Sequence, residues 1–219
     1  MIERHLHFSR VERPPPDETA AGARQRLADR FPRTALRRMT HLGLLAGAAL
    51  DGLTLGAEDA IVYATTYAET RALEDYLLSF PLASPLLFQT SIHPSAVQQV
   101  MIGRQQPVGR FWPVTGRARL VESALLTALL EPAGRVVLVG GEERGSWLLD
   151  ERMASGEAFA YALLLTSEAA GAQGRVRFAP GDAAADGPCP DTVEFAEALA
   201  ARRSLHWTGA GGEWAVEFP

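Results

Sequence analysis

The sequence predicts a single globular domain of the α/β class. Strand-like apolar runs, clearest at 60–66, 135–139 and 158–166, alternate with helix-like stretches along the chain. The 219 residues are 47% hydrophobic and 21% charged, which provides enough apolar material for a sizeable core. We therefore expect one domain that covers residues 1–219.

The N-terminal half begins with an alternating strand that Pro14-Pro15-Pro16 brings to an end. The later helix at 37–50 is rich in alanine and glycine, which favours tight packing against a sheet. The predicted elements of this half, in order, are strand 2–11, helix 20–30, helix 37–50, strand 60–66 and helix 69–80.

The C-terminal half continues the alternation with shorter strands. Its predicted elements are helix 92–101, strand 108–114, helix 119–130, strand 135–139, strand 158–166, strand 175–178, helix 192–203 and strand 213–218. The segment 180–190 is rich in Gly, Ala, Asp and Pro, so it is predicted to be a mobile loop.

The segment 91–142 carries the most informative pattern. A short helix leads to the turn Gln106-Pro107-Val108, a strand follows, and a later strand ends in Leu138-Val139-Gly140-Gly141-Glu142, where the two glycines are interpreted as a structural turn. This order resembles β-ketoacyl synthases, in which a Gly-Pro-Ser turn, a strand, the catalytic cysteine at the start of a helix and a strand ending in Val-Gly-Gly follow one another. The resemblance covers residues 36–168.

The resemblance implies a thiolase-like fold, specifically the N-terminal half of a ketosynthase. In that fold a mixed five-stranded sheet lies between helical layers. The other ketosynthase half, which carries two catalytic histidines and a lysine, has no counterpart in this sequence.

Thr115 falls at the position of the catalytic cysteine when the residues are counted from the turn. A ketosynthase holds its acyl chain on a thiolate, which a helix N-terminus favours, whereas a threonine hydroxyl is a poor nucleophile without a dedicated base. The resemblance therefore implies a degenerate site with no catalytic residue in this chain. The alternative is that Thr115 merely begins a helix. The one cysteine, Cys189, lies in a turn-rich loop and is interpreted as an incidental thiol.

Composition argues against several other classes of function. The net charge of −5 does not indicate a nucleic-acid surface. All 21 basic residues are arginine, so the chain offers no Schiff-base or phosphate-loop lysine. The isolated histidines indicate no metal site, and we expect no cofactor. Neither a signal peptide nor a membrane span is visible in the sequence, which makes the cytoplasm the expected location.

A short chain of this kind resembles the ketosynthase-like, chain-length-factor proteins of aryl polyene and related systems. It implies a non-catalytic partner of a full-length type II ketosynthase, which shapes the acyl tunnel during polyene or fatty acyl elongation on acyl carrier protein. The expected assembly is a heterodimer with that ketosynthase, or a homodimer when the chain is alone. Two alternatives stay open: a stand-alone thiolase-fold enzyme that transfers or hydrolyses acyl groups, and an acyl-binding scaffold.

The resemblance also implies which residues meet the partner. The helix before the turn would form the far wall of the partner's tunnel, and helical spacing puts Val97, Val100 and Met101 on one face. The alternative is that this face packs into its own sheet. The candidate tunnel and interface residues are Ile92, His93, Val97, Val100, Met101, Phe111 and Trp112. The last two lie on a strand expected to pair across a two-fold axis, where alternation turns them to opposite sides.

Overall fold

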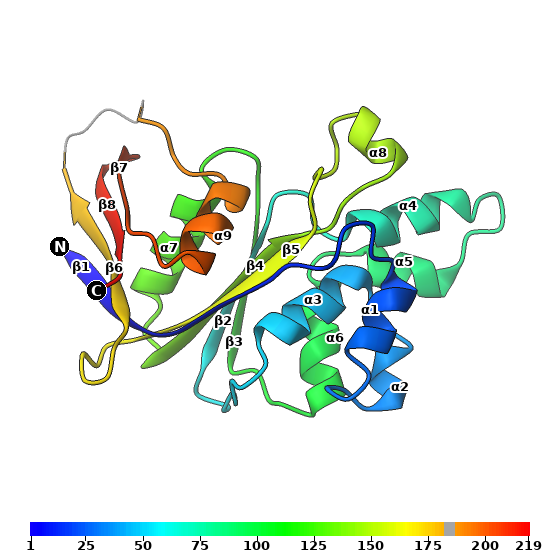
Figure 1. Cartoon of the computed structure of the whole chain (residues 1–219), viewed down its shortest axis with the longest axis horizontal. Coiled ribbons are helices and arrows are strands. Elements are labelled where there is room, and N and C mark those ends of the chain that lie inside the picture. The colour runs from blue at the N-terminus through cyan, green and yellow to red at the C-terminus, as the bar shows by residue number, and fades with distance from the viewer. Residues whose placement is uncertain (182–186) are drawn as a thin grey trace.

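The computed structural model describes residues 1–181 and 187–219, and the fold they form is built on one large sheet (Figure 1). Within these residues the sheet has eight strands in the order β3-β2-β4-β5-β1-β6-β8-β7. The strands are β1 (Ile2–Glu12), β2 (Ala60–Thr65), β3 (Arg110–Thr115), β4 (Arg135–Glu142), β5 (Phe159–Thr166), β6 (Gly174–Pro180), β7 (Leu205–Gly209) and β8 (Gly212–Glu217).

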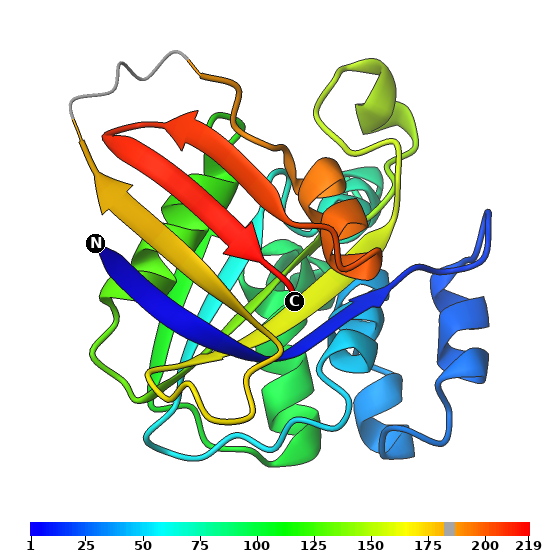
Figure 2. The same ribbon diagram turned by 60° about the vertical axis from the view of Figure 1, so that its left-hand side comes forward.

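The sheet is mixed, as predicted. Strand β2 runs parallel to both β3 and β4, whereas the remaining neighbours pair in antiparallel fashion. The predicted number of five strands is wrong, because the sheet continues past β1. That strand pairs with β5 through His5–Glu12 and with β6 through Ile2–Leu6, so it joins the C-terminal hairpins to the rest of the sheet. Figure 2 shows β6, β8 and β7 in orange and red beside the blue start of β1.

Helices cover both faces of the sheet, which confirms the layered α/β architecture. They are α1 (Ala20–Arg26), α2 (Arg33–Leu36), α3 (His41–Ala49), α4 (Thr70–Leu78), α5 (Pro85–Ser91), α6 (Ser95–Arg104), α7 (Leu120–Leu130), α8 (Trp147–Asp150) and α9 (Thr192–Ala200). One apolar core lies between the sheet and the helices α7 and α9, and a second lies between the sheet and the helices α1, α3 and α6.

Several element ends differ from the predictions for local reasons. Helix α3 begins at His41 rather than at 37, because the Thr40 hydroxyl accepts a hydrogen bond from the Gly43 N–H at 3.1 Å and caps the helix. Gly140 and Gly141 form no turn and lie inside β4. A side chain at Gly140 would collide with the buried Tyr161 hydroxyl, so glycine is needed there for close packing.

Four short elements were not predicted from the sequence, namely α2, α5, α8 and β7. The central residues 182–186 of the loop predicted to be mobile lie outside the described residues. None of the helices in the described ranges combines the length and the apolar character that a bilayer crossing requires.

Candidate functional site

Thr115 is the last residue of β3 and is exposed to solvent. Helix α7 begins at Leu120, after Arg119, whose backbone is left-handed with a φ of 54° and whose side chain makes no cap. Thr115 therefore does not begin the helix, which removes the alternative interpretation of this residue.

Cys189 lines a cavity of about 310 Å³ near the N-termini of α7 and α9. The thiol is half-buried, and burial is the main cause that raises its pKa to about 11. A thiol with so high a pKa supplies almost no thiolate at neutral pH. The geometry thus agrees with the interpretation of Cys189 as an incidental thiol.

Glu142 anchors the loop that connects β2 to α4. Its carboxylate accepts hydrogen bonds from the Thr66 N–H at 2.6 Å, the Thr65 hydroxyl at 3.0 Å and the Tyr67 N–H at 3.2 Å. The side chain is buried, and that burial raises its pKa even though these donors favour the charged form. The carboxylate therefore acts as an internal anchor for the loop.

Glu143 joins the starts of two helices. One carboxylate oxygen accepts from the Leu42 N–H of α3 at 3.1 Å, and the other accepts from the Arg71 N–H of α4 at 2.7 Å. Both donors belong to first helical turns, whose N–H groups have no partner within the helix. Burial raises the pKa of Glu143 to about 7.

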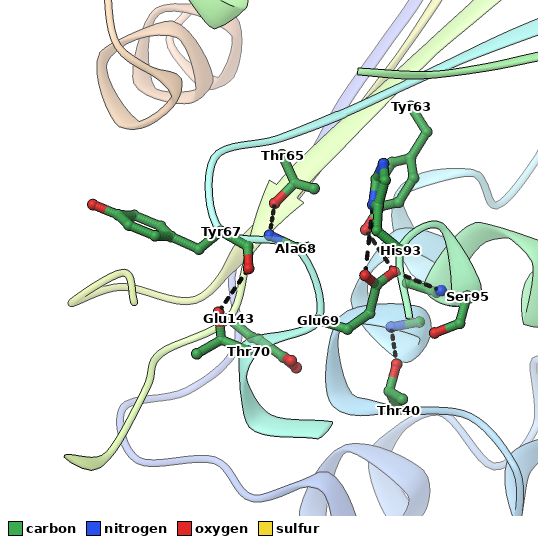
Figure 3. A network of polar contacts seen from close by, with 12 residues as sticks. Thr40, Tyr63, Thr65, Tyr67, Ala68, Glu69, Thr70, His93, Ser95 and Glu143 are labelled. Atoms are coloured by element: carbon green, nitrogen blue, oxygen red, sulfur yellow. Dashed lines mark hydrogen bonds and ion pairs between the residues drawn. The ribbon is translucent and has the colours of Figure 1, made fainter. Parts of the chain in front are cut away.

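Glu69, Tyr63 and His93 form the centre of the same polar network (Figure 3). Glu69 accepts from the Ala96 N–H at the start of α6 at 2.9 Å and from the Tyr63 hydroxyl at 3.4 Å. The His93 ring is stacked on the Tyr63 ring, with 4.7 Å between their centroids, and its Nδ1 lies 3.5 Å from a Glu69 oxygen. We call Glu69, His93, Glu142 and Glu143, together with Tyr63, the buried glutamate cluster.

Sequence reasoning singled out His93 but missed the partners that fix its position. The available signal was the pair Glu142-Glu143, which directly follows an apolar strand where two adjacent charges are unusual. Both ring nitrogens of His93 are buried, so they are not presented to a substrate that arrives from solvent. Within the described part of the chain, no three metal-ligating side chains converge.

The predicted tunnel residues divide into two groups. Val97, Val100 and Met101 are buried and pack in the core that contains α3, inside this chain. Ile92 lies at the corner between α5 and α6 and is 47% exposed. The inward packing is the alternative that the sequence left open, and Ile92 alone of the four presents an apolar side chain to the surface.

Phe111 and Trp112 lie on β3, at one edge of the sheet. Phe111 packs against the core, whereas Trp112 is 46% exposed, and its indole N–H donates to Glu131 at 2.6 Å. The two side chains thus face opposite sides of the strand, as predicted. In the described residues β3 pairs with β2 alone, which leaves its other edge open for a partner.

An apolar hairpin, formed by α4 and α5, projects from the body of the molecule in Figure 1. Its residues 76–92 include no charged side chain. Leu82 is 86% exposed, Leu86 61% and Phe88 50%. Large apolar side chains gathered on one exposed hairpin are typical of a protein–protein contact.

Comparisons with known proteins agree with this architecture. No protein-family model matches the sequence, and no curated protein matches it. One chain of a complex between the ketosynthase ApeO and its chain length factor ApeC, from Xenorhabdus doucetiae, is 17% identical with a TM-score of 0.67. The match covers 99% of this chain and 100% of that chain.

The ishigamide ketosynthase/chain length factor is a second similar structure. It is 16% identical with a TM-score of 0.53, and the match covers 76% of this chain. That match spans about half, 54%, of the ishigamide chain. The chain described here therefore has the thiolase-like fold found in ketosynthase/chain-length-factor complexes.

Proposed function

We propose that this chain is a non-catalytic, chain-length-factor-like partner of a full-length β-ketoacyl synthase. The observation that carries the proposal is the match of nearly the whole chain to an entire chain of a ketosynthase/chain-length-factor complex. An exposed threonine at the expected nucleophile position, with Cys189 as a poorly ionised thiol, supports a role without catalysis of its own.

The proposed assembly is a heterodimer in which the partner supplies the cysteine and the histidines. The open edge of β3 and the apolar hairpin α4–α5 are the surfaces available for it. The complex would elongate a polyene or fatty acyl chain on acyl carrier protein in the cytoplasm. When the chain is expressed alone, the same surfaces would support a homodimer.

The reconstituted reaction tests this proposal. The isolated chain, incubated with malonyl- and acyl-carrier-protein thioesters, is expected to form no product. Addition of a cognate ketosynthase should give elongated acyl products that the ketosynthase alone does not make at the same length or rate. Mass spectrometry of the carrier-protein thioesters measures both outcomes, and condensation by the isolated chain would refute the proposal.

In this proposal, the exposed side chains of this chain shape the acyl tunnel of the partner. Val97, Val100 and Met101 contact this chain's own core, so in the proposal they set the position of α6 while Ile92, Leu86 and Phe88 are able to meet the partner's acyl chain.

A matched pair of substitutions separates the two roles. Ile92→Trp is expected to shorten the product of the complex, because added volume at a tunnel wall blocks a growing chain, while the stability of this chain changes little. Val97→Phe is expected to cost about 1–3 kcal/mol of stability through overpacking of a buried site. Product analysis and urea unfolding measure the two effects. Unchanged product length in Ile92→Trp, with the complex assembled, would remove Ile92 from the tunnel.

A further inference from the structure

Three buried polar atoms without a hydrogen-bond partner meet in one place. They are Oε2 of Glu69 and both ring nitrogens of His93. His93 Nδ1 lies 3.5 Å from that Glu69 oxygen, and the ring is held there by its stacking on Tyr63 (Figure 3). Buried polar atoms are nearly always paired, so a group of three requires a physical explanation.

The charges around these atoms point to that explanation. Glu69, Glu142 and Glu143 are all buried, and none of them forms an ion pair with an arginine within residues 1–181 and 187–219. The nearby Arg71 guanidinium is bound instead to Glu74 at 2.9 Å. Because uncompensated buried charges are costly, the cluster is stabilised when protons reduce its negative charge.

We propose that Glu69, His93 and Glu143 form a buried proton-binding site that links the protonation of this cluster to the packing of α3, α4 and α6. A protonated His93 would place its positive charge beside Glu69, and a protonated Glu143 would remove a negative charge from the same region. The inference concerns the isolated chain and does not depend on the proposed function.

The coupling to helix packing follows from the hydrogen bonds of the two carboxylates. Glu143 holds the Leu42 and Arg71 N–H groups at the starts of α3 and α4, and Glu69 holds the Ala96 N–H at the start of α6. A change of charge on either carboxylate therefore acts on a helix terminus directly.

Tyr63, Glu142 and His41 are further titratable groups near the site. Tyr63 faces it from β2, and burial raises its pKa well above the ordinary value, so it stays neutral. Glu142 faces it from β4 and is also disfavoured as an anion by burial. On α3, His41 lies next to Leu42 and is directed to Glu18 at 3.6 Å, and burial lowers its pKa.

The direction of the pH effect follows from Glu143. Burial raises its pKa from 4.5 to about 7, so between these values the folded chain holds a proton that the unfolded chain has released. The folding equilibrium constant therefore falls as pH rises through this window, in total on the order of a hundredfold. His41, whose pKa burial lowers, opposes this trend at acidic pH.

The test compares the pH dependence of variants rather than their absolute stability. Urea unfolding of the full chain is measured at about pH 5 and about pH 8 at one ionic strength, for wild type, Glu143→Gln and His93→Phe. The phenylalanine keeps the stacking on Tyr63 but binds no proton. Both variants should shift the ratio of the two folding constants relative to wild type, by up to about a hundredfold for Glu143→Gln.

Glu74→Gln is the matched control, because Glu74 is equally buried but is paired with Arg71. It should lower stability at both pH values and leave their ratio at the wild-type value. In Glu143→Gln the side-chain amide of the new glutamine would face a backbone N–H, so this variant could fail to fold. His93→Phe then still tests the proposal. A wild-type ratio in His93→Phe, together with a wild-type ratio in any folded Glu143→Gln, would overturn the proposal.

Discussion

Glu142→Ala is expected to destabilise the fold by about 3–5 kcal/mol at neutral pH. The substitution leaves the Thr66 and Tyr67 N–H groups and the Thr65 hydroxyl without their acceptor, and it opens a cavity at the end of β4. A buried donor that loses its acceptor costs about 1–3 kcal/mol, so three of them account for the estimate even after partial relaxation. Urea unfolding measures the change.

Two variants bracket that result. Glu142→Gln keeps one acceptor oxygen and should cost clearly less than the alanine variant. Glu151→Ala, at an exposed glutamate, should stay within about 0.5 kcal/mol of wild type. If Glu142→Ala were as stable as Glu151→Ala, the carboxylate would not anchor the β2–α4 loop.

Phe88→Glu is expected to weaken the proposed heterodimer by at least about a hundredfold. Phe88 is 50% exposed on the apolar hairpin, and its ring contacts Tyr76 with 5.3 Å between centroids. The negative charge would be buried in the complex without a partner, whereas in the free chain it stays in water. Titration with the cognate ketosynthase in an ultracentrifuge or calorimeter measures the dissociation constant.

His206→Glu is the control for this experiment. His206 is exposed on β7, at the edge of the sheet opposite to β3, so the same new charge lies far from the proposed contact. It should leave the affinity unchanged. Equal affinities for Phe88→Glu, His206→Glu and wild type would show that the hairpin is not part of the interface.

The sequence predicted the α/β class because several of its strands are apolar runs, such as 60–66 and 158–166, and this prediction is confirmed. The width of the sheet could not be predicted in the same way. Strand β7 contains only two buried large side chains, Leu205 and Trp207, and the pairing of β1 with β6 is a contact between distant segments. The local pattern of apolar residues does not predict pairing between strands that are distant in the sequence.

The site shows the same limit. Helical spacing placed Val97, Val100 and Met101 on one face but could not tell whether that face meets a partner or the chain's own core. His93 was recognised from its place before Pro94, whereas Tyr63 and Glu69 lie on another segment that only the folded sheet brings to it. Burial and charge balance around His93 are properties of the tertiary structure alone.

The double pairing of β1 has a kinetic consequence. His5 lies opposite Thr166 and Ile2 lies opposite Phe178, so β1 completes its hydrogen bonds only after the distant strands β5 and β6 have been synthesised. Folding is slow when a long loop must close, because the chain loses entropy before the new contacts can compensate for the loss. We expect refolding in the slower class of α/β domains, with β1 as the segment whose docking unites the two halves of the sheet at the end.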